Sequence, residues 1–360
     1  MTEVNSMLER MKCCLQDAIE NKVFPGCVVG VVNGENEHYI TQGHHTFEQN
    51  SEPMSFLSVF DCASVTKAIP VSFIALQLID QNRIGTTDRM VDFLPEYKGT
   101  YREEIQIRHL LTHTLDFDFR LSRCKDMPPE KILEAVLNVR MKSRPGETYC
   151  YANATSILLG MVIERICGKS LPETAQERIF DPVGMDNSTF FPEKIDNQTI
   201  IPTEIDTWRG RVIRGEVHDE SAWALRPLMV AGSAGLFSNA PDLLNFMKMV
   251  LSGGVARDNR ILSSGILDEM CTDQIPEIEG CVTGLGWELD QPYMGTKRTC
   301  TTFGKTGFTG CAVIGDRQRN AALVVLSNFT WPTRKQDRKL INRVRSDLAD
   351  MLWESVPKTG

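Results

Sequence analysis

The sequence predicts an α+β fold in which both ends of the chain contribute to one antiparallel sheet, flanked by the N- and C-terminal helices. A helical pattern and a hairpin open the chain, and strands followed by a helical pattern close it. The stretch between them reads as helices joined by loops. Since helices and strands segregate along the chain, they should form separate layers. We therefore expect residues 1–60 and 271–360 to form one discontinuous α/β lobe. Residues 61–270 should form a mostly helical lobe inserted into it, with the functional site at the junction.

The first element is an amphipathic helix, because its apolar residues recur at helical spacing. These residues are Val4, Met7, Leu8, Met11, Leu15 and Ile19. An apolar run over residues 26–32 then meets Asn33-Gly34, a strong signal for a hairpin turn, and residues 38–42 can return as the partner strand. Residues 64–81 follow as a helix that should bend at Pro70, which lacks a backbone N–H.

The middle of the chain predicts helices with recognisable ends. One helix begins at Pro129, a second covers residues 155–167 and stops at Gly168, and a third follows Pro241. The stretch from residue 190 to residue 218 has a weak, polar pattern, which predicts a long excursion over the surface.

The C-terminal part returns to strand patterns and ends in a helix. The predicted strands cover residues 284–289, 299–306, 311–314 and 321–326, and a polar turn over residues 316–320 precedes the last of them. The final helix is expected to turn its apolar residues inward, namely Leu340, Val344, Leu348 and Met351.

The composition is that of an acidic globular protein. A chain of 360 residues can bury roughly 75% of its unfolded surface. The net charge of −8 argues against a nucleic-acid partner, which would need a basic face. The basic stretch over residues 334–345 is interpreted as the solvated face of the C-terminal helix.

No segment is typical of a membrane or exported protein. Apolar runs stay short of the roughly 18 residues that a membrane span needs, and the charged N-terminal residues do not resemble a signal peptide. The eleven cysteines are odd in number and include no Cys-x-x-Cys, which suits a reducing compartment better than a disulfide framework. We therefore expect a cytoplasmic protein with a small-molecule substrate and with no membrane or nucleic-acid partner.

Ser-x-x-Lys patterns start at Ser64, Ser122 and Ser355, so the bare pattern is a weak signal. A serine acts as a nucleophile only with a base within hydrogen-bond reach. At a helix start, Ser64 and Lys67 would lie one turn apart on one face, and the Ser64 N–H would be available to stabilise an oxyanion. A lysine base also needs its pKa lowered, by burial or by another cation nearby.

Two further motifs supply partners for this pair. Lys305-Thr306-Gly307 lies on a predicted strand with glycines on both sides, whereas its copy at residues 358–360 has no strand around it. Tyr151 is the only tyrosine with an asparagine, Asn153, two positions later. A phenol between two lysines can relay protons. The asparagine amide can orient a substrate carbonyl, or it can serve as a turn or helix cap.

In this order the motifs resemble those of the serine β-lactamases, penicillin-binding proteins and related esterases, and most closely the class C β-lactamase-like branch. The likeness covers nearly the whole chain and implies a β-lactamase/transpeptidase-like fold. It implies Ser64 as nucleophile, Lys67 as base, and Tyr151 as their partner that protonates the leaving group. It also implies that no metal or organic cofactor is needed. The substrate-binding residues implied by the resemblance are Asn153, Lys305, Thr306, Gly307 and Phe308, the last through its amide in an oxyanion hole.

The sequence departs from the family pattern at three places. Leu115-Asp116 stands where many members have Ser-Gly, and Ser233 stands where a histidine is frequent. Lys305 stands where many esterases of the family have histidine. This lysine favours a substrate with a carboxylate, as in β-lactams.

The histidines near these motifs need separate interpretation. His109 and His113 have the i, i+4 spacing of a metal-binding pair, but no third ligand pattern follows, so helix packing or a hydrogen bond is the better interpretation. The pair His218-Asp219 stays open between a structural role and a place in the pocket.

We therefore expect a serine hydrolase that forms an acyl-enzyme and cleaves an ester, amide or β-lactam bond of a small, carboxylate-bearing substrate. Acyltransferases and D-amino-acid peptidases of the same family use this constellation and stay as alternatives. A third alternative is a sensor that β-lactams acylate and that barely turns over.

Overall fold

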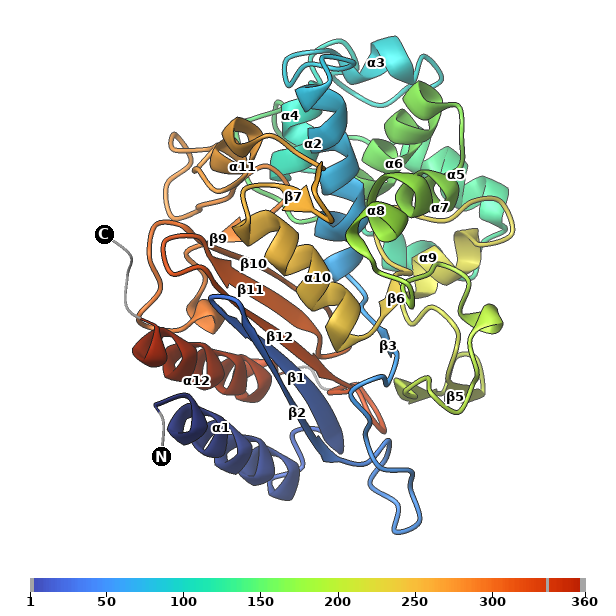
Figure 1. Cartoon of the computed structure of the whole chain (residues 1–360). Coiled ribbons are helices and arrows are strands. Elements are labelled where there is room, and N and C mark those ends of the chain that lie inside the picture. Colours follow the sequence, from blue (N-terminus) through green and yellow to red (C-terminus); the bar gives the residue numbers. More distant parts are fainter. Residues whose placement is uncertain (1–2, 335–336, 357–360) are drawn as a thin grey trace.

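Strands from both ends of the chain form one antiparallel sheet in the computed structural model, which describes residues 3–334 and 337–356 (Figure 1). In their order across the sheet the strands are β2 (Asn36–Gly43), β1 (Gly26–Asn33), β12 (Ala321–Ser327), β11 (Ala312–Asp316), β10 (Thr302–Thr306) and β9 (Glu288–Leu289). The N-terminal hairpin thus pairs with the last strand of the chain, with Val29 opposite Val325. The predicted α+β fold is confirmed.

Helices joined by loops form the remaining chain, with a few short ladders. The α-helices are α1 (Glu3–Glu20), α2 (Phe73–Asp80), α3 (Met90–Phe93), α4 (Ile107–Thr112), α5 (Pro129–Leu137), α6 (Asn153–Cys167), α7 (Leu171–Ala175), α8 (Asp181–Val183), α9 (Glu220–Leu225), α10 (Ala240–Leu251), α11 (Ser264–Met270) and α12 (Lys339–Ser355). Shorter helical turns are η1 (Lys67–Ser72), η2 (Leu121–Cys124), η3 (Gln176–Phe180), η4 (Pro192–Lys194) and η5 (Pro292–Met294). Small two-stranded ladders join β3 (Phe60–Asp61) to β6 (Phe237–Ser238), β4 (Glu204–Asp206) to β5 (Arg211–Ile213), and β7 (Val255–Ala256) to β8 (Asn259–Arg260).

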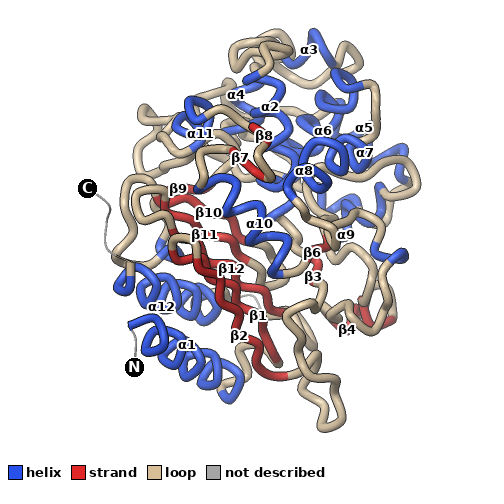
Figure 2. Tube along the Cα trace, in the orientation of Figure 1, coloured by secondary structure: helices blue, strands red, loops and turns tan. Residues whose placement is uncertain are grey.

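Both faces of the sheet are covered, so the inner strands β1, β11 and β12 are buried on both sides, whereas the edge strand β2 is partly exposed. Val29 and Val31 pack with α1 and α12, which lie side by side on one face (Figure 1). Val28 and Val32 belong to the larger core on the other face, where α10 crosses β1 and β12. Figure 2 shows this sheet between two layers: α1 and α12 lie on one side, and α10 with the remaining helices lies on the other. The division of the chain at residues 61 and 270 stays a prediction.

Several local predictions are confirmed at the level of backbone geometry. The first helix buries Met7 and Met11, and the hairpin turns at Gly34 with a positive φ of 64°. Helix α6 ends at Gly168, whose φ of 68° is the left-handed conformation that glycine adopts without a Cβ clash. The eleven cysteines all lie within the described residues and are free thiols. Among the described residues, no helix has the length and apolar character needed to cross a membrane.

Two predicted strands are wrong in part, because local hydrogen bonds bend the chain before the ladder begins. The Gly284 N–H donates to the Trp287 carbonyl (2.9 Å), so residues 284–287 form a turn and only β9 continues as strand. The hydroxyls of Thr299 and Thr302 both donate to the Asp316 carboxylate, at 2.7 and 2.6 Å. These bonds fold residues 299–301 ahead of β10.

The predicted surface excursion over residues 190–218 is also wrong for its central part. Thr203 and its neighbours are buried because polar side chains near the end of the sheet bind their carbonyl groups. The Asn328 amide donates to the Pro202 carbonyl (2.9 Å), and the Thr330 hydroxyl donates to the Thr203 carbonyl (2.7 Å). The polar pattern reflects these internal hydrogen bonds, which a pattern of hydropathy does not reveal.

The basic stretch at residues 334–345 does not form a uniformly solvated face. Arg345 is 1% exposed and donates to the Cys311 carbonyl (3.0 Å), while Arg334 pairs with Glu204. Leu340, expected to face inward, is instead 55% exposed, because α12 turns the neighbouring Ile341 into the core.

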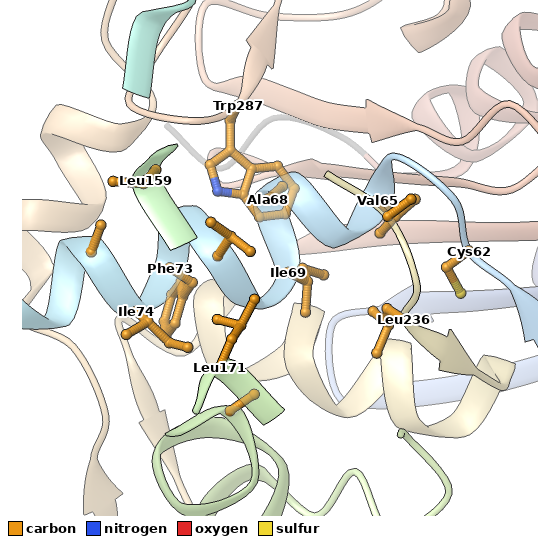
Figure 3. Close-up of a cluster of buried hydrophobic side chains, with 14 of the residues drawn as sticks. Cys62, Val65, Ala68, Ile69, Phe73, Ile74, Leu159, Leu171, Leu236 and Trp287 are labelled. Carbon is orange, nitrogen blue, oxygen red and sulfur yellow. The ribbon is translucent and has the colours of Figure 1, made fainter. Parts of the chain in front are cut away.

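The helix that follows the first Ser-x-x-Lys motif is interrupted as Pro70 requires. Ile69, inside η1, has non-helical φ and ψ of −118° and 112°. Figure 3 shows Trp287 against Ala68 in this region, near Phe73. The Trp287 ring also stacks on Phe246 with centroids 6.2 Å apart. The tryptophan therefore joins the strand end of β9 to the helix that carries the motif.

We predict that Trp287→Ala lowers the free energy of unfolding by about 3–5 kcal/mol, because the cavity left by the indole cannot close between a helix and a sheet. Urea denaturation measures the change. Phe47→Ala, at a side chain that is 37% exposed, is the control and should change stability by less than about 0.5 kcal/mol. A loss for Trp287→Ala as small as that of the control would contradict the proposed packing role.

Candidate active site

The first Ser-x-x-Lys motif forms a bonded pair. The Lys67 Nζ donates to the Ser64 Oγ at 2.9 Å and to the Ser233 carbonyl at 2.7 Å. Lys67 is 2% exposed, and no carboxylate of residues 3–334 and 337–356 forms an ion pair with it. A buried amine next to a hydroxyl is placed to exchange a proton with it.

The turn before Ser64 is held in an uncommon conformation by Asp61. Ala63 has a φ of 46°, which is unfavourable for a residue with a Cβ. The Ala63 N–H donates to the Asp61 carboxylate (2.7 Å), and the Thr66 hydroxyl donates to the Ala63 carbonyl (2.6 Å). These bonds fix the turn that presents Ser64 ahead of η1.

Tyr151 lies in the loop before α6, between the two lysines of the predicted motifs. The Lys67 and Lys305 Nζ atoms lie 5.1 and 4.6 Å from the centroid of its ring. The Cys150 N–H donates to the His113 carbonyl (2.8 Å), and the His113 ring packs on the Tyr151 ring with centroids 4.8 Å apart. The structure thus brings together Ser64, Lys67, Tyr151 and Lys305.

The two lysines shift the protonation of their neighbours. Burial raises the pKa of Tyr151, but Lys67, Lys305 and a hydrogen bond with Ser64 lower it by more, so the pKa lies below the ordinary 10.0. Because 43% of Tyr151 is exposed, the two cations outweigh burial and lower the pKa of the phenol. Burial, with Lys305 and then Lys67, holds the pKa of His113 well below 6.5, so His113 is neutral.

Lys305 has a counter-ion of its own, which the sequence did not predict. Its Nζ lies 2.7 Å from the Glu288 Oε1, and the Tyr293 hydroxyl donates to the other oxygen at 2.8 Å. Burial lowers the pKa of Lys305, but Glu288 and Tyr151 raise it by more, so Lys305 stays charged. Glu288 comes from the neighbouring strand, where it lies opposite Gly304, the residue before Lys305.

Two backbone N–H groups near Ser64 are available to a ligand. Those of Ser64 and Phe308 have no hydrogen-bond partner within the described ranges of the chain. A Cβ added at Gly307 would lie 2.4 Å from the Cys62 carbonyl oxygen, so only glycine allows the turn after β10 to approach this closely. The Thr309 hydroxyl donates to the Asp61 carbonyl (2.7 Å) and joins the two turns. Two such free N–H groups are the components of an oxyanion hole.

Asn153 and Asp219 form a hydrogen-bonded pair. The sequence leaves open whether Asn153 orients a substrate or caps a helix, and whether Asp219 is structural or lines the pocket. The Asn153 amide nitrogen donates to the Asp219 Oδ2 (2.9 Å), and the other oxygen accepts from the Ala222 N–H (2.8 Å) at the start of α9. Asp219 is therefore a helix cap that also fixes Asn153. No described residue donates to the Asn153 amide oxygen. That oxygen stays available to a substrate N–H.

A polar cavity of about 330 Å³ is lined in part by Glu288, the counter-ion of Lys305. Thr306 and Glu288 connect this cavity to the lysine, and Arg338 contributes a cation. No carboxylate of the described residues forms an ion pair with Arg338. The residues that line the cavity are Tyr149, Gly280, Cys281, Val282, Glu288, Gln291, Tyr293, Thr306, Arg338 and Asn342.

The second Ser-x-x-Lys does not assemble into a site. Ser122 is exposed in η2, and the Lys125 ammonium lies over the Trp208 ring, 4.6 Å from its centroid. The lysine of the third Ser-x-x-Lys, Lys358, and the second Lys-Thr-Gly, residues 358–360, lie outside the described residues. His109 accepts a hydrogen bond from the Gln106 N–H (3.1 Å) at the start of α4, which is a capping role.

This fold and a serine bonded to a buried lysine define a class, the serine hydrolases of the β-lactamase and penicillin-binding type. The family model described as Beta-lactamase matches residues 12–346, and the chain belongs to that family. The resemblance recognised from the motifs is thereby confirmed, and the protein is a serine hydrolase.

Similar proteins carry different activities in their names. A putative D-alanyl-D-alanine carboxypeptidase of Escherichia coli K12 is 26% identical over 303 residues, which cover 75% of this chain and 69% of the relative. Among solved structures, EstCE1, a hydrolase with promiscuous acyltransferase activity, has a TM-score of 0.76 at 21% identity and covers 97% of this chain and 99% of its own. A β-lactamase/D-alanine carboxypeptidase from Pseudomonas syringae has a TM-score of 0.77 at 17% identity, with 97% and 99% covered. At these identities the solved structures establish the shared fold alone.

We predict that Gly307→Ala reduces kcat/KM by about 100- to 1,000-fold, the usual effect of losing an oxyanion-hole donor. The added Cβ must push the turn that carries Phe308 away from the Cys62 carbonyl. Steady-state kinetics on an activated ester measures the effect. Gly265→Ala in α11 is the matched control, since its Cβ would meet no atom within 4 Å. Equal activity in the two variants would show that the close approach at Gly307 does not matter.

We predict that Glu288→Gln moves the acidic limb of the kcat/KM profile to lower pH. Glu288 raises the pKa of Tyr151, so its removal leaves the two ammonium groups unopposed and the phenol ionises more readily. The pH dependence of kcat/KM through the neutral range tests this shift. Glu277→Gln, at an exposed carboxylate, is the control and should leave the profile in place. A shift toward higher pH would refute the electrostatic role of Glu288.

Proposed function

We propose that this serine hydrolase cleaves an ester, amide or β-lactam bond of a small molecule through an acyl-enzyme on Ser64. The observation that carries the proposal is the 2.9 Å contact between the Ser64 hydroxyl and a buried Lys67, with Tyr151 held between Lys67 and Lys305. The cytoplasmic location and the absence of a cofactor that the sequence favours are part of this proposal.

In the acylation step the Ser64 Oγ attacks the substrate carbonyl, and its proton passes to the unit formed by Lys67 and Tyr151. The carbonyl oxygen becomes an oxyanion and accepts hydrogen bonds from the Ser64 and Phe308 N–H groups. The bond to the leaving group then breaks, and Tyr151 returns the proton to the departing oxygen or nitrogen. Asn153 orients the substrate through its free amide oxygen.

In the second step water attacks the acyl-enzyme, and the same proton-accepting unit removes its proton. Ser64 takes a proton back as the acid is released, so the enzyme returns to its initial state. An alcohol or amine in place of water would give acyl transfer. The fold is shared by hydrolases and acyltransferases, so the acceptor has to be decided by experiment.

We propose a substrate with a carboxylate, as expected from the Lys-Thr-Gly motif. The residue that binds this carboxylate differs from the one expected. Lys305 is already paired with Glu288, so its charge mainly acts on Tyr151. Arg338 lines the cavity next to Thr306 and has no ion-pair partner among the described residues. We therefore assign recognition of the carboxylate to Arg338, whose planar guanidinium suits that group.

The acyl-enzyme itself is testable with a fluorophosphonate probe and intact-protein mass spectrometry. We expect one adduct per chain, located on Ser64 by peptide mapping, and none on Ser64→Ala. Ser122→Ala is the control and should label like the unmodified protein, because Ser122 has no lysine bonded to it. Labelling that persists in Ser64→Ala would mean that another residue is the nucleophile.

The roles of Arg338 and Lys305 can be distinguished with two esters that differ only in a free carboxylate. Arg338→Met should lower kcat/KM for the carboxylate-bearing ester by about 10- to 200-fold relative to its neutral partner, the loss of one charge-assisted hydrogen bond. Lys305→Met should reduce both esters alike, because it acts through Tyr151. Lys339→Met, at an exposed neighbour, should change neither. A selective loss with Lys305→Met alone would return carboxylate recognition to Lys305.

A further inference from the structure

The Phe308 side chain is held on several sides, although only its backbone N–H has a place in the proposed mechanism. The His218 ring stacks on it with centroids 5.5 Å apart and an interplanar angle of 23°. The Arg338 and Arg334 guanidinium carbons lie 4.2 and 5.8 Å from the ring centroid. Such contacts fix the position of an aromatic ring, and the backbone N–H of the same residue moves with it.

His218 is in turn held rigidly by charged groups. It is 3% exposed, and its Nε2 lies 2.8 Å from the Glu204 carboxylate. Arg334 binds that carboxylate through two nitrogens, at 3.0 and 2.7 Å, and pairs with Glu220 at 2.7 Å. A hydrogen bond to a carboxylate that is itself held by an arginine orients the imidazole and leaves it little freedom.

The backbone of His218 connects the same network to the nucleophile. Its N–H donates to the Asp61 Oδ2 at 2.7 Å, while the Asp61 Oδ1 accepts from the Ala63 N–H at 2.7 Å. One carboxylate therefore holds the residue before Ser64 and the residue whose ring supports Phe308. Both free N–H groups, of Ser64 and of Phe308, are positioned from this one point.

We propose that His218 is a positioning residue of the oxyanion hole: its ring sets the place of the Phe308 N–H relative to that of Ser64. This proposal rests on the proposed function and extends it to a residue that does not touch the substrate. The turn at residues 307–310 is bonded at its ends, by the Gly307 N–H to the Cys311 carbonyl (2.7 Å) and by the Thr309 hydroxyl to the Asp61 carbonyl (2.7 Å). The stacked ring adds a constraint on Phe308 itself, which lies between these bonds.

The test compares His218→Ala, which removes the ring, with His218→Phe, which keeps a ring for stacking. In His218→Phe the Glu204 carboxylate still has Arg334 as its partner. Three quantities are measured besides Tm: kcat and KM on an activated ester, and the Kd of a boronic acid that forms a tetrahedral adduct on the serine. His44→Ala, at an exposed histidine, is the control.

We expect His218→Ala to lower kcat and to weaken boronic acid binding, each by about 10- to 100-fold, because a small displacement of one donor has effects of this size. KM should change by less than about threefold, since the ground state depends little on the oxyanion hole. His218→Phe should recover most of both losses. A role limited to stability would lower Tm and leave the Kd of the boronic acid in the folded protein unchanged.

Two results would overturn the inference. One is a Kd for the boronic acid that is the same in His218→Ala and the unmodified protein, and the other is an equal loss in His218→Ala and His218→Phe. Failure of the proposed function is seen separately, as the absence of a boronic acid adduct on Ser64 in the unmodified protein. If that adduct forms and both histidine variants bind the boronic acid normally, only the role of His218 is refuted.

Discussion

One buried carboxylate, Asp61, holds together the three segments that meet at Ser64. Its side chain accepts the N–H groups of Ala63 and His218, and its carbonyl accepts the Thr309 hydroxyl. Burial raises the pKa of Asp61 above 3.8, while the bonds from His218 and Ala63 oppose that rise. A carboxylate in the interior is costly unless its oxygens are bonded, so these segments are stable only when they are brought together. The β3–β6 ladder places Asp61 where they converge.

The two lysines of the site have different roles because their side chains have different partners. Lys67 and Lys305 are both 2% exposed and both lie against the Tyr151 ring. Lys305 has the Glu288 carboxylate at 2.7 Å, whereas Lys67 has the Ser64 hydroxyl and a carbonyl. A lysine with a counter-ion supplies a lasting positive charge, and a lysine bonded to a nucleophile can exchange a proton with it. The division of roles in the proposed mechanism follows from these partners.

The fold alone leaves the reaction open, because a β-lactamase/D-alanine carboxypeptidase and a hydrolase with promiscuous acyltransferase activity share it. Features outside the shared motifs bear on specificity in this chain. Glu288 occupies the edge strand beside Lys305, and Arg338 faces the cavity of about 330 Å³ from the start of α12. Lys305 is thus a paired cation against the Tyr151 ring, and Arg338, with no ion-pair partner among the described residues, lies over the Phe308 ring.

The sequence by itself determined the elements whose signals are local. Helical spacing located α1, Asn33-Gly34 located the first hairpin, and Gly168 ended α6, because each depends on neighbours within a few residues. The order of the three motifs was enough to bring Ser64, Lys67, Tyr151 and Lys305 into one proposed site. The motifs can be recognised because they are short and belong to a known family. The structure places the four side chains together, and their catalytic roles stay a proposal.

Only the tertiary structure decided which charged residues serve the site. Glu288 reaches Lys305 across a strand pair, and Glu204 reaches His218 and Arg334 across 14 and 130 positions of sequence. The pattern near Arg334 is that of a solvated helix face, and the pattern near Glu204 is that of a surface loop. Both patterns misled because hydropathy records the cost of burying a charge and not the partner that offsets it. The partner comes from a distant part of the chain, and it is known only once the chain has folded.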